Sequence, residues 1–322
     1  MSPSTASVVV ATYERPTFVA RCLDHLAAQT TPPIEVVVVD SSAGRETAEL
    51  VADQYPAVRY ERNTAGRGAT ATARDIGYRC STGEVLAFVD DDAFAEPEWL
   101  ERLLPHFGDP TVGGVGGRQI RGQSGELTEG VDAIGRLLPD GTLTGNFAAD
   151  PGRAIVVDHL LGASMSFRRS VVDELGGIHD GYRGTCIREE TDLCLRVTRA
   201  GYRLVYEPAA VVEHVAGPYA KGNRFDLRYT YWAQKNHLIL LMRIYGVTHP
   251  LVRRYLATST HLVWDDGKSR ARRARDRALN LELRGAAASA GGVVTRAAVV
   301  MGASVAGLLA GASAARADRR GG

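Results

Sequence analysis

The sequence predicts an α/β fold with a mixed, mainly parallel sheet flanked by helices, of the Rossmann-like type. Two runs of β-branched apolar residues, at 7–12 and 34–40, are separated by a stretch near 17–29 whose apolar residues recur with helical spacing. A third apolar run, at 85–89, ends directly in three aspartates. Strands that alternate with helices form parallel sheets, and such sheets bind ligands where their strands end. We therefore expect a ligand site at the carboxyl edge of this sheet.

The remaining elements continue the alternation. The first helix follows a proline, which is favoured at the first helical position. Further along, we expect a helix at 46–54, a strand at 58–62, a helix at 69–81, helices at 171–175 and 190–200, and strands at 204–208 and 210–212. Between them, residues 113–152 are glycine-rich and lack periodicity, which predicts a long irregular excursion with short antiparallel strands.

Polar side chains stand where the predicted parallel strands end, namely Thr12, Asp40 and Asp90. Asp91 and Asp92 follow Asp90 without a spacer. Adjacent ionised carboxylates repel unless a cation lies among them, and a hard divalent ion such as Mg²⁺ or Mn²⁺ prefers their oxygens. Alternate spacing favours Asp90 and Asp92 as ligands, with Asp91 as a helper. The alternative interpretation is a solvated acidic turn that caps the following helix.

Composition excludes one class of partner and indicates a compartment. The 38 basic and 37 acidic residues nearly cancel, so no global field favours nucleic acid. The four cysteines show neither CxxC spacing nor a zinc pattern, which predicts reduced thiols in a cytoplasmic protein. No signal-peptide pattern precedes the first apolar run, so we expect the N-terminal part to stay in the cytoplasm.

We expect three segments: a core domain at 1–218, a helical extension at 219–285, and an alanine- and glycine-rich helix or tail at 286–322. The last segment contains 19 uncharged residues, 297–315, which is close to the length of a membrane span. Their glycine and serine content favours a helix that packs on protein or lies on a membrane surface over a true span. The protein is then cytoplasmic or peripheral at the inner face of the cell membrane.

Six short segments occur in order at regular spacing along the chain. They are VVVATYERP at 8–16, VVVDSS at 37–42, ARDIG at 73–77, FVDDD at 88–92, GASMSFRR at 162–169 and EETDLCLR at 189–196. Together they resemble the family two glycosyltransferases of the GT-A fold, and the resemblance covers about residues 6–245. It implies a GT-A nucleotide-sugar-binding catalytic domain at 1–218, here followed by a C-terminal helical extension at 219–285 that would complete the acceptor side.

The resemblance also implies a donor site. In the family, the carboxylate that ends the second strand grips the nucleotide base, and residues after the first strand line the same pocket. Glu14 stands where asparagine is frequent, which separates this chain from the usual pattern. The implied nucleotide-sugar-binding residues are Thr12, Glu14, Asp40, Arg74, Asp90 and Asp91. The implied ligands for Mg²⁺ or Mn²⁺ are Asp92, Asp90 and His214, the last matching a family histidine near the metal or the diphosphate.

The second acidic cluster is the expected source of the catalytic base. An inverting displacement needs a carboxylate on the acceptor side to take the proton from the attacking hydroxyl. Glu190 occupies the position where the family base is usually aspartate, so we expect it to be the base, with Asp192 as the alternative. Acidic residues are also simply favourable at helix starts. The segment Gly162, Ala163 and Ser164 is expected to line the acceptor side.

The resulting functional prediction is a metal-assisted inverting glycosyltransferase that uses a nucleotide-diphosphate sugar, most simply a UDP-sugar. Its acceptor would be a saccharide, a lipid-linked intermediate or a small molecule, as in polysaccharide or cell-envelope biosynthesis. Two alternatives stay open. The first is a nucleotidyltransferase, which also places carboxylates and metal at strand ends. Such an enzyme is expected to have a glycine-rich phosphate-binding loop with a lysine, and residues 12–16 contain neither. A catalytically inactive nucleotide-sugar-binding scaffold is favoured by the unusual Glu190.

Overall fold

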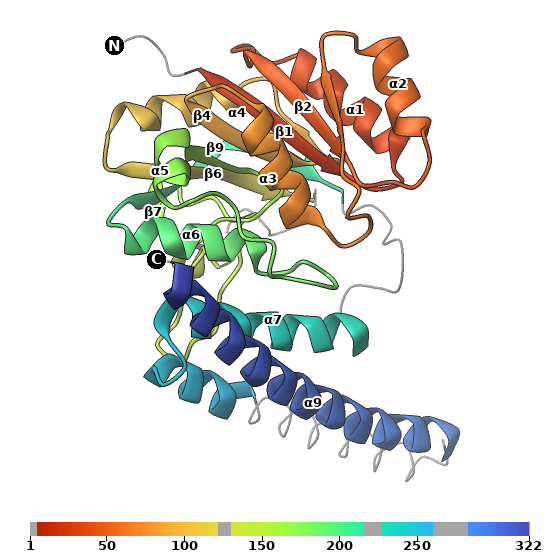
Figure 1. The fold of residues 1–322 in the computed structure, drawn as a ribbon, viewed down its shortest axis with the longest axis vertical. Helices are drawn as coiled ribbons and strands as arrows, with labels where there is room; N and C mark the ends of the chain where they lie inside the picture. The colour runs from red at the N-terminus through yellow and green to blue at the C-terminus, as the bar shows by residue number, and fades with distance from the viewer. Residues whose placement is uncertain (1–4, 122–129, 216–226, 260–282, 322) are drawn as a thin grey trace. The chain divides into compact units, whose positions relative to one another are not determined.

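In the computed structural model, the backbone is described for residues 5–121, 130–215, 227–259 and 283–321 (Figure 1). The chain divides into two compact units. The first comprises residues 1–137 and 143–220, and the second comprises residues 138–142 and 221–322. The domain boundary expected at 218 lies outside the described residues. The division expected at 285 falls inside one continuous helix.

The first unit contains one mixed sheet in the order β3-β2-β1-β4-β8-β6-β9-β5, with β7 beside β9. Its four parallel strands are β1 Ala6–Thr12, β2 Glu35–Asp40, β3 Arg59–Arg62 and β4 Val85–Asp90. Thr12 pairs in register with Asp40, and Ala11 with Asp90. The polar residues at the strand ends therefore lie side by side at one edge of the sheet, as the sequence predicts.

The other half of the sheet consists of β5 Ala93–Ala95, β6 Val112–Ile120, β7 Ile155–Val157, β8 Met165–Arg168 and β9 Arg203–His214. Strand β8 runs antiparallel to both β4 and β6, whereas β6 runs parallel to β9. Strand β9 is longer than the sequence pattern predicts. Its last residue, His214, pairs with Ala93 just after the three aspartates, which brings this histidine to them.

The expectation of an irregular excursion from residue 113 onward is wrong for its first part, because 112–120 form the buried strand β6. Because four of its nine residues are glycines, this strand shows no alternation of apolar and polar side chains in the sequence. A Cβ on Gly114 would lie 2.8 Å from side-chain atoms of Leu204 and Phe167, and one on Gly117 would lie 2.2 Å from the carbonyl oxygen of Ala210. Neighbouring strands and side chains fill the space that larger residues would occupy elsewhere.

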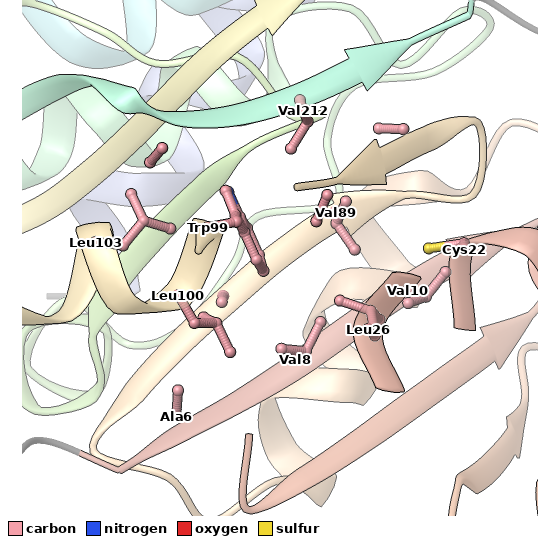
Figure 2. Close-up of a cluster of buried hydrophobic side chains, with 14 of the residues drawn as sticks. Ala6, Val8, Val10, Cys22, Leu26, Val89, Trp99, Leu100, Leu103 and Val212 are labelled. Atoms are coloured by element: carbon pink, nitrogen blue, oxygen red, sulfur yellow. The ribbon is translucent and has the colours of Figure 1, made fainter. Parts of the chain in front are cut away.

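Helices cover both faces of this sheet. They are α1 Pro16–Ala27, α2 Glu46–Gln54, α3 Thr70–Cys80, α4 Trp99–Leu103, α5 Arg169–Glu174 and α6 Glu189–Arg199, with short 3₁₀ helices at Leu104–Gly108 and Val131–Ala133. Val8 and Val10 of β1 belong to one hydrophobic cluster, while Val9 between them belongs to the other. This alternation is the period of two expected of a strand buried on both faces. Figure 2 shows the first cluster, in which Trp99 of α4 lies near Val89 of β4.

The second unit contains helix α7 Leu227–Tyr245, a helix at 250–259 and the long helix α9 Leu283–Gly321. Buried polar side chains connect these helices. Gln234 donates to the hydroxyls of Ser259 and Ser304, each at 3.1 Å, and accepts from Tyr255 at 2.7 Å. A buried amide with all of these bonds satisfied fixes how the three helices align.

Candidate active site

Two arginines pair with the three aspartates at the end of β4. Arg74 of α3 donates to Asp90 at 2.8 Å. Arg15, just after β1, donates to Asp91 at 3.0 Å and to Asp92 at 3.1 Å. The repulsion that led us to expect a cation is therefore partly balanced by the protein itself. Sequence reasoning missed Arg15, although its place directly after a strand end was the available signal.

Asp91 lies deepest of the three and is the least exposed. Its Oδ2 accepts a hydrogen bond from the Thr12 hydroxyl at 2.7 Å. Burial raises the pKa of the Asp91 carboxyl to about 7, while the charge of Arg15 opposes this shift. A carboxyl so deeply buried and bonded on both oxygens helps to position the loop, and its role in donor binding stays a prediction.

Asp90, Asp92 and His214 form the group best suited to hold a metal ion. One ligand atom from each lies within 4.8 Å of the others, and His214 Nε2 is 3.3 Å from Asp92 Oδ1. Two carboxylate oxygens with one imidazole suit Mn²⁺ well, and Mg²⁺ less well because it prefers oxygen ligands alone. The remaining coordination positions would fall to water and to phosphate oxygens.

Arg74 connects this group to the acidic start of α6. Its guanidinium is buried and pairs with Asp90 on one side and with Glu189 on the other. Sequence reasoning gave Glu189 no role, because its pairing depends on how α3 and α6 pack. Gly162 makes room for the arginine: a Cβ at this position would lie 2.4 Å from Arg74 Nη2.

Substitution of Gly162 by alanine is therefore expected to displace the Arg74 side chain. The added methyl group would push the guanidinium away from Asp90 or Glu189, and we expect kcat to fall about tenfold because the site is sensitive to small displacements. Gly145→Ala is the matched control, since a Cβ there meets nothing within 4 Å. Steady-state kinetics and thermal unfolding of both variants measure the effect, and an unchanged kcat for Gly162→Ala would contradict this role for Arg74.

The two candidates for the catalytic base differ in burial and in hydrogen bonding. Asp192 is fully buried, and its oxygens accept hydrogen bonds from Tyr182 at 2.6 Å and from Arg196 at 2.8 Å. Glu190 is only partly buried, and among the described residues no other side chain donates a hydrogen bond to it. Burial raises the pKa of the Glu190 carboxyl, with the charge of Arg74 opposing. A carboxylate that is not held by other described side chains and has a raised pKa is the better proton acceptor near neutral pH.

The backbone ahead of Glu190 is strained. Cys186 and Arg188 adopt left-handed conformations, with φ of 56° and 86°, although neither is glycine. The Cys186 thiol donates to the carbonyl oxygen of Gly68 at 2.6 Å, which ties this segment to the loop before α3. Near Glu190, Arg188 Nε is buried, and no described residue forms a hydrogen bond with it. Unpaired buried donors are rare in proteins and call for an explanation at this site.

Asp40 ends β2 with both oxygens bonded inside the protein. One accepts from the amide and the hydroxyl of Ser42, and the other accepts from Tyr60 at 2.9 Å. Glu14 has a φ of 53°, and its amide donates to the Ser42 hydroxyl at 2.6 Å. Asparagine tolerates this left-handed backbone better than most residues, which accounts physically for its frequency at the position of Glu14. The roles of Asp40 and Glu14 in donor binding stay predictions.

The segment expected on the acceptor side forms a mostly buried turn directly before β8. Ala163 and Ser164 are buried, and the Ser164 hydroxyl accepts from Trp99 Nε1 at 2.9 Å and from the amide of Gly117 at 3.1 Å. Gly162 is partly exposed beside Arg74. Of these three residues, Gly162 is thus the one placed to contact a ligand, and the acceptor-side role stays a prediction.

Comparison with known proteins gives this arrangement of residues a family. The model for glycosyl transferase family 2 matches residues 7–176, which include β1, β4, the three aspartates and Gly162. The chain belongs to glycosyl transferase family 2. Membership agrees with the resemblance carried by the sequence motifs.

Two curated relatives illustrate the similarity. A pre-mycofactocin glycosyltransferase of Mycobacterium tuberculosis is 34% identical over 146 residues, covering 45% of this chain and 29% of the relative. A glucosyl-dolichyl phosphate glucuronosyltransferase of Haloferax volcanii is 30% identical over 222 residues, covering 65% of this chain and 68% of the relative. This family 2 chain therefore spans less than a third of the first relative and about two thirds of the second.

Solved structures confirm the GT-A fold. A mannosyltransferase from Pyrobaculum calidifontis, in complex with GDP-Man and Mn²⁺, superposes with a TM-score of 0.56 at 20% identity, covering 94% of this chain and 88% of that one. GalNAc-T7 with UDP, GalNAc and Mn²⁺ gives a TM-score of 0.56 at 18% identity, covering 75% of this family 2 chain and 48% of that one.

Proposed function

We propose that this glycosyltransferase moves a sugar from a nucleotide-diphosphate donor to an acceptor hydroxyl with inversion, using Asp90, Asp92 and His214 to hold a divalent cation and Glu190 as the base. One observation carries the proposal: Arg74 pairs both with Asp90 of the group suited to a cation and with Glu189 at the start of the helix that bears Glu190. The proposed site thus combines positive charge that would attract phosphate with a carboxylate, that of Glu190, that would accept a proton.

The chain's own residues account for most of the reaction. Arg15 and Arg74 supply positive charge next to the strand ends, where a diphosphate would bind. The oxygen of the attacking hydroxyl bonds to the anomeric carbon, and Glu190 takes the proton of that hydroxyl. The bond from the anomeric carbon to the diphosphate breaks in the same step. The divalent cation, when bound, supplies Lewis-acid stabilisation of the departing diphosphate. The unpaired Arg188 Nε near Glu190 can donate to a polar group of a bound substrate.

The donor is proposed to be a UDP-sugar. The structural neighbours contain nucleotides with different bases, GDP-Man in one and UDP in the other, so the test must compare bases. We propose a saccharide, a lipid-linked intermediate or a small molecule as the acceptor. The Haloferax relative is named for a dolichyl phosphate-linked acceptor, which supports including lipid-linked acceptors in the test.

Thermal unfolding with a panel of UDP-, GDP- and dTDP-sugars, each with and without Mn²⁺, tests the proposal. At about one hundred times Kd, a donor stabilises the folded state by about 2.7 kcal/mol, so we expect the cognate nucleotide sugar to raise Tm by about 5 °C or more with Mn²⁺. Product analysis then separates the mechanisms: sugar transfer from the nucleotide sugar releases a nucleoside diphosphate, whereas transfer of its nucleotidyl group releases a sugar phosphate. Binding without release of either product would support the inactive scaffold instead.

A further inference from the structure

Helix α9 has two faces of different character, and one of them packs on α7. Ala303, Gly307, Gly311 and Ala315 recur every four residues, and all four are buried. A Cβ on Gly307 would lie 3.0 Å from Leu238 Cβ, and one on Gly311 would lie 2.7 Å from the Met242 sulfur. Small residues at this spacing allow two helices to approach closely. This face of α9 is therefore already occupied within its own unit.

Another face of α9 leaves large apolar side chains exposed. Met301, Val305 and Leu309, also four residues apart, are 60%, 58% and 70% exposed. Arg316 is exposed as well, and at about 3.6 residues per turn it falls between Val305 and Leu309 around the helix axis. The exposed face is thus an apolar stripe with a basic residue towards its C-terminal end.

The charges of α9 indicate what covers this stripe. The helix contains five arginines and one aspartate, Asp318. Asp318 pairs with Arg243 of α7 at 3.1 Å, so its negative charge is balanced within the unit. An apolar stripe on a basic helix matches the boundary between the acyl chains and the anionic headgroups of a membrane. We propose that α9 lies on an anionic lipid surface through Met301, Val305, Leu309 and Arg316.

The packing of α9 favours lying on the membrane over crossing it. By length and composition, Ala298–Asp318 is the one candidate span found among the described residues. A crossing α9 would carry along its partner α7, whose Lys235 and Arg243 are charged and whose Gln234 bonds to Ser304 of α9. Charged side chains are costly in the hydrocarbon core, whereas a surface position buries only the exposed stripe.

Co-sedimentation of the full chain with lipid vesicles tests this inference. We expect the wild-type protein to bind phosphatidylglycerol–phosphatidylcholine vesicles, to bind pure phosphatidylcholine vesicles more weakly, and to dissociate as salt rises. Leu309→Asp should lower the partition coefficient by at least about tenfold, because it places a charge in the centre of the apolar stripe. Ile34→Asp is the matched control: Ile34 is 53% exposed in the first unit, and the change in charge is the same.

The outcomes of these measurements either support or contradict membrane binding by α9. Loss of binding in Leu309→Asp and in a second variant, Val305→Asp, with retention in Ile34→Asp and unchanged donor hydrolysis in all three, supports the membrane surface. The inference is overturned if the wild-type protein ignores anionic vesicles, or if it is a dimer by light scattering and Leu309→Asp makes it monomeric without any effect on vesicle binding. Because donor hydrolysis is measured separately, failure here leaves the proposed reaction untouched.

Discussion

Asp92→Asn is expected to lower the rate of sugar transfer by about a thousandfold, of the order found when one electrostatic contact to a developing charge is lost. The substitution keeps the volume of the side chain but removes a charged oxygen from the group that includes Asp90 and His214. Initial rates measured across a Mn²⁺ titration should show a weaker metal dependence together with the lower maximum. Treatment of the wild-type enzyme with a chelator should have a similar effect, reversible on addition of Mn²⁺.

Asp53→Asn is the control for this experiment, since Asp53 is an exposed carboxylate on α2 and the change in charge is identical. Thermal unfolding should show that both variants are folded. The proposed cation would have to be abandoned if Asp92→Asn kept a rate within twofold of wild type, or if chelation left the wild-type rate unchanged. In that case Arg15 and Arg74 would be the remaining source of positive charge for the diphosphate.

Glu190→Gln is expected to lower transfer by about a hundredfold to ten thousandfold, the usual contribution of a positioned base. An amide cannot take the proton of the attacking hydroxyl, yet it has nearly the shape of the carboxyl group. Binding of the donor should survive, because Glu190 is not among the cation ligands proposed here. The measurements are single-turnover transfer and the Mn²⁺-dependent rise in Tm with donor.

Asp192→Asn is the informative comparison. It weakens hydrogen bonds from Tyr182 and Arg196 to a fully buried carboxylate, so we expect a loss of about 1–3 kcal/mol in the free energy of unfolding with a largely preserved kcat. The two variants should thus differ in what they lose. Glu190→Gln should lose activity and keep its stability, whereas Asp192→Asn should lose stability and keep its activity. The opposite pattern would make Asp192 the base.

The part of the site that depends on strand ends could be predicted from the sequence. Runs of β-branched residues identify β1, β2 and β4, and parallel neighbours must end at the same edge, so Thr12, Asp40 and Asp90 come together without knowledge of any contact. The family motifs then added His214, whose place beside Asp92 follows from the pairing of β5 with β9.

Features that depend on packing between distant segments could not be predicted in this way. Strand β6 has glycines where its neighbours supply the bulk, so it has no apolar period to detect. Arg15 and Glu189 looked like ordinary charged residues, because an ion pair is recognised only when both partners are placed. The same holds for Asp192, whose bonds to Tyr182 and Arg196 show a structural role that its place in an acidic motif conceals.

The buried bridge from Asp90 through Arg74 to Glu189 has a consequence for engineering this enzyme. Arg74 cannot move to suit a new donor without changing its pairing with Glu189, the residue that precedes Glu190 at the start of α6. If Arg74 contacts the donor and Glu190 the acceptor, as proposed, donor preference and acceptor preference are mechanically linked, and libraries that vary only one side of the site should yield few active variants. Variation of the α3 and α6 termini together with Gly162 offers a route to exchange the donor while keeping the base in position.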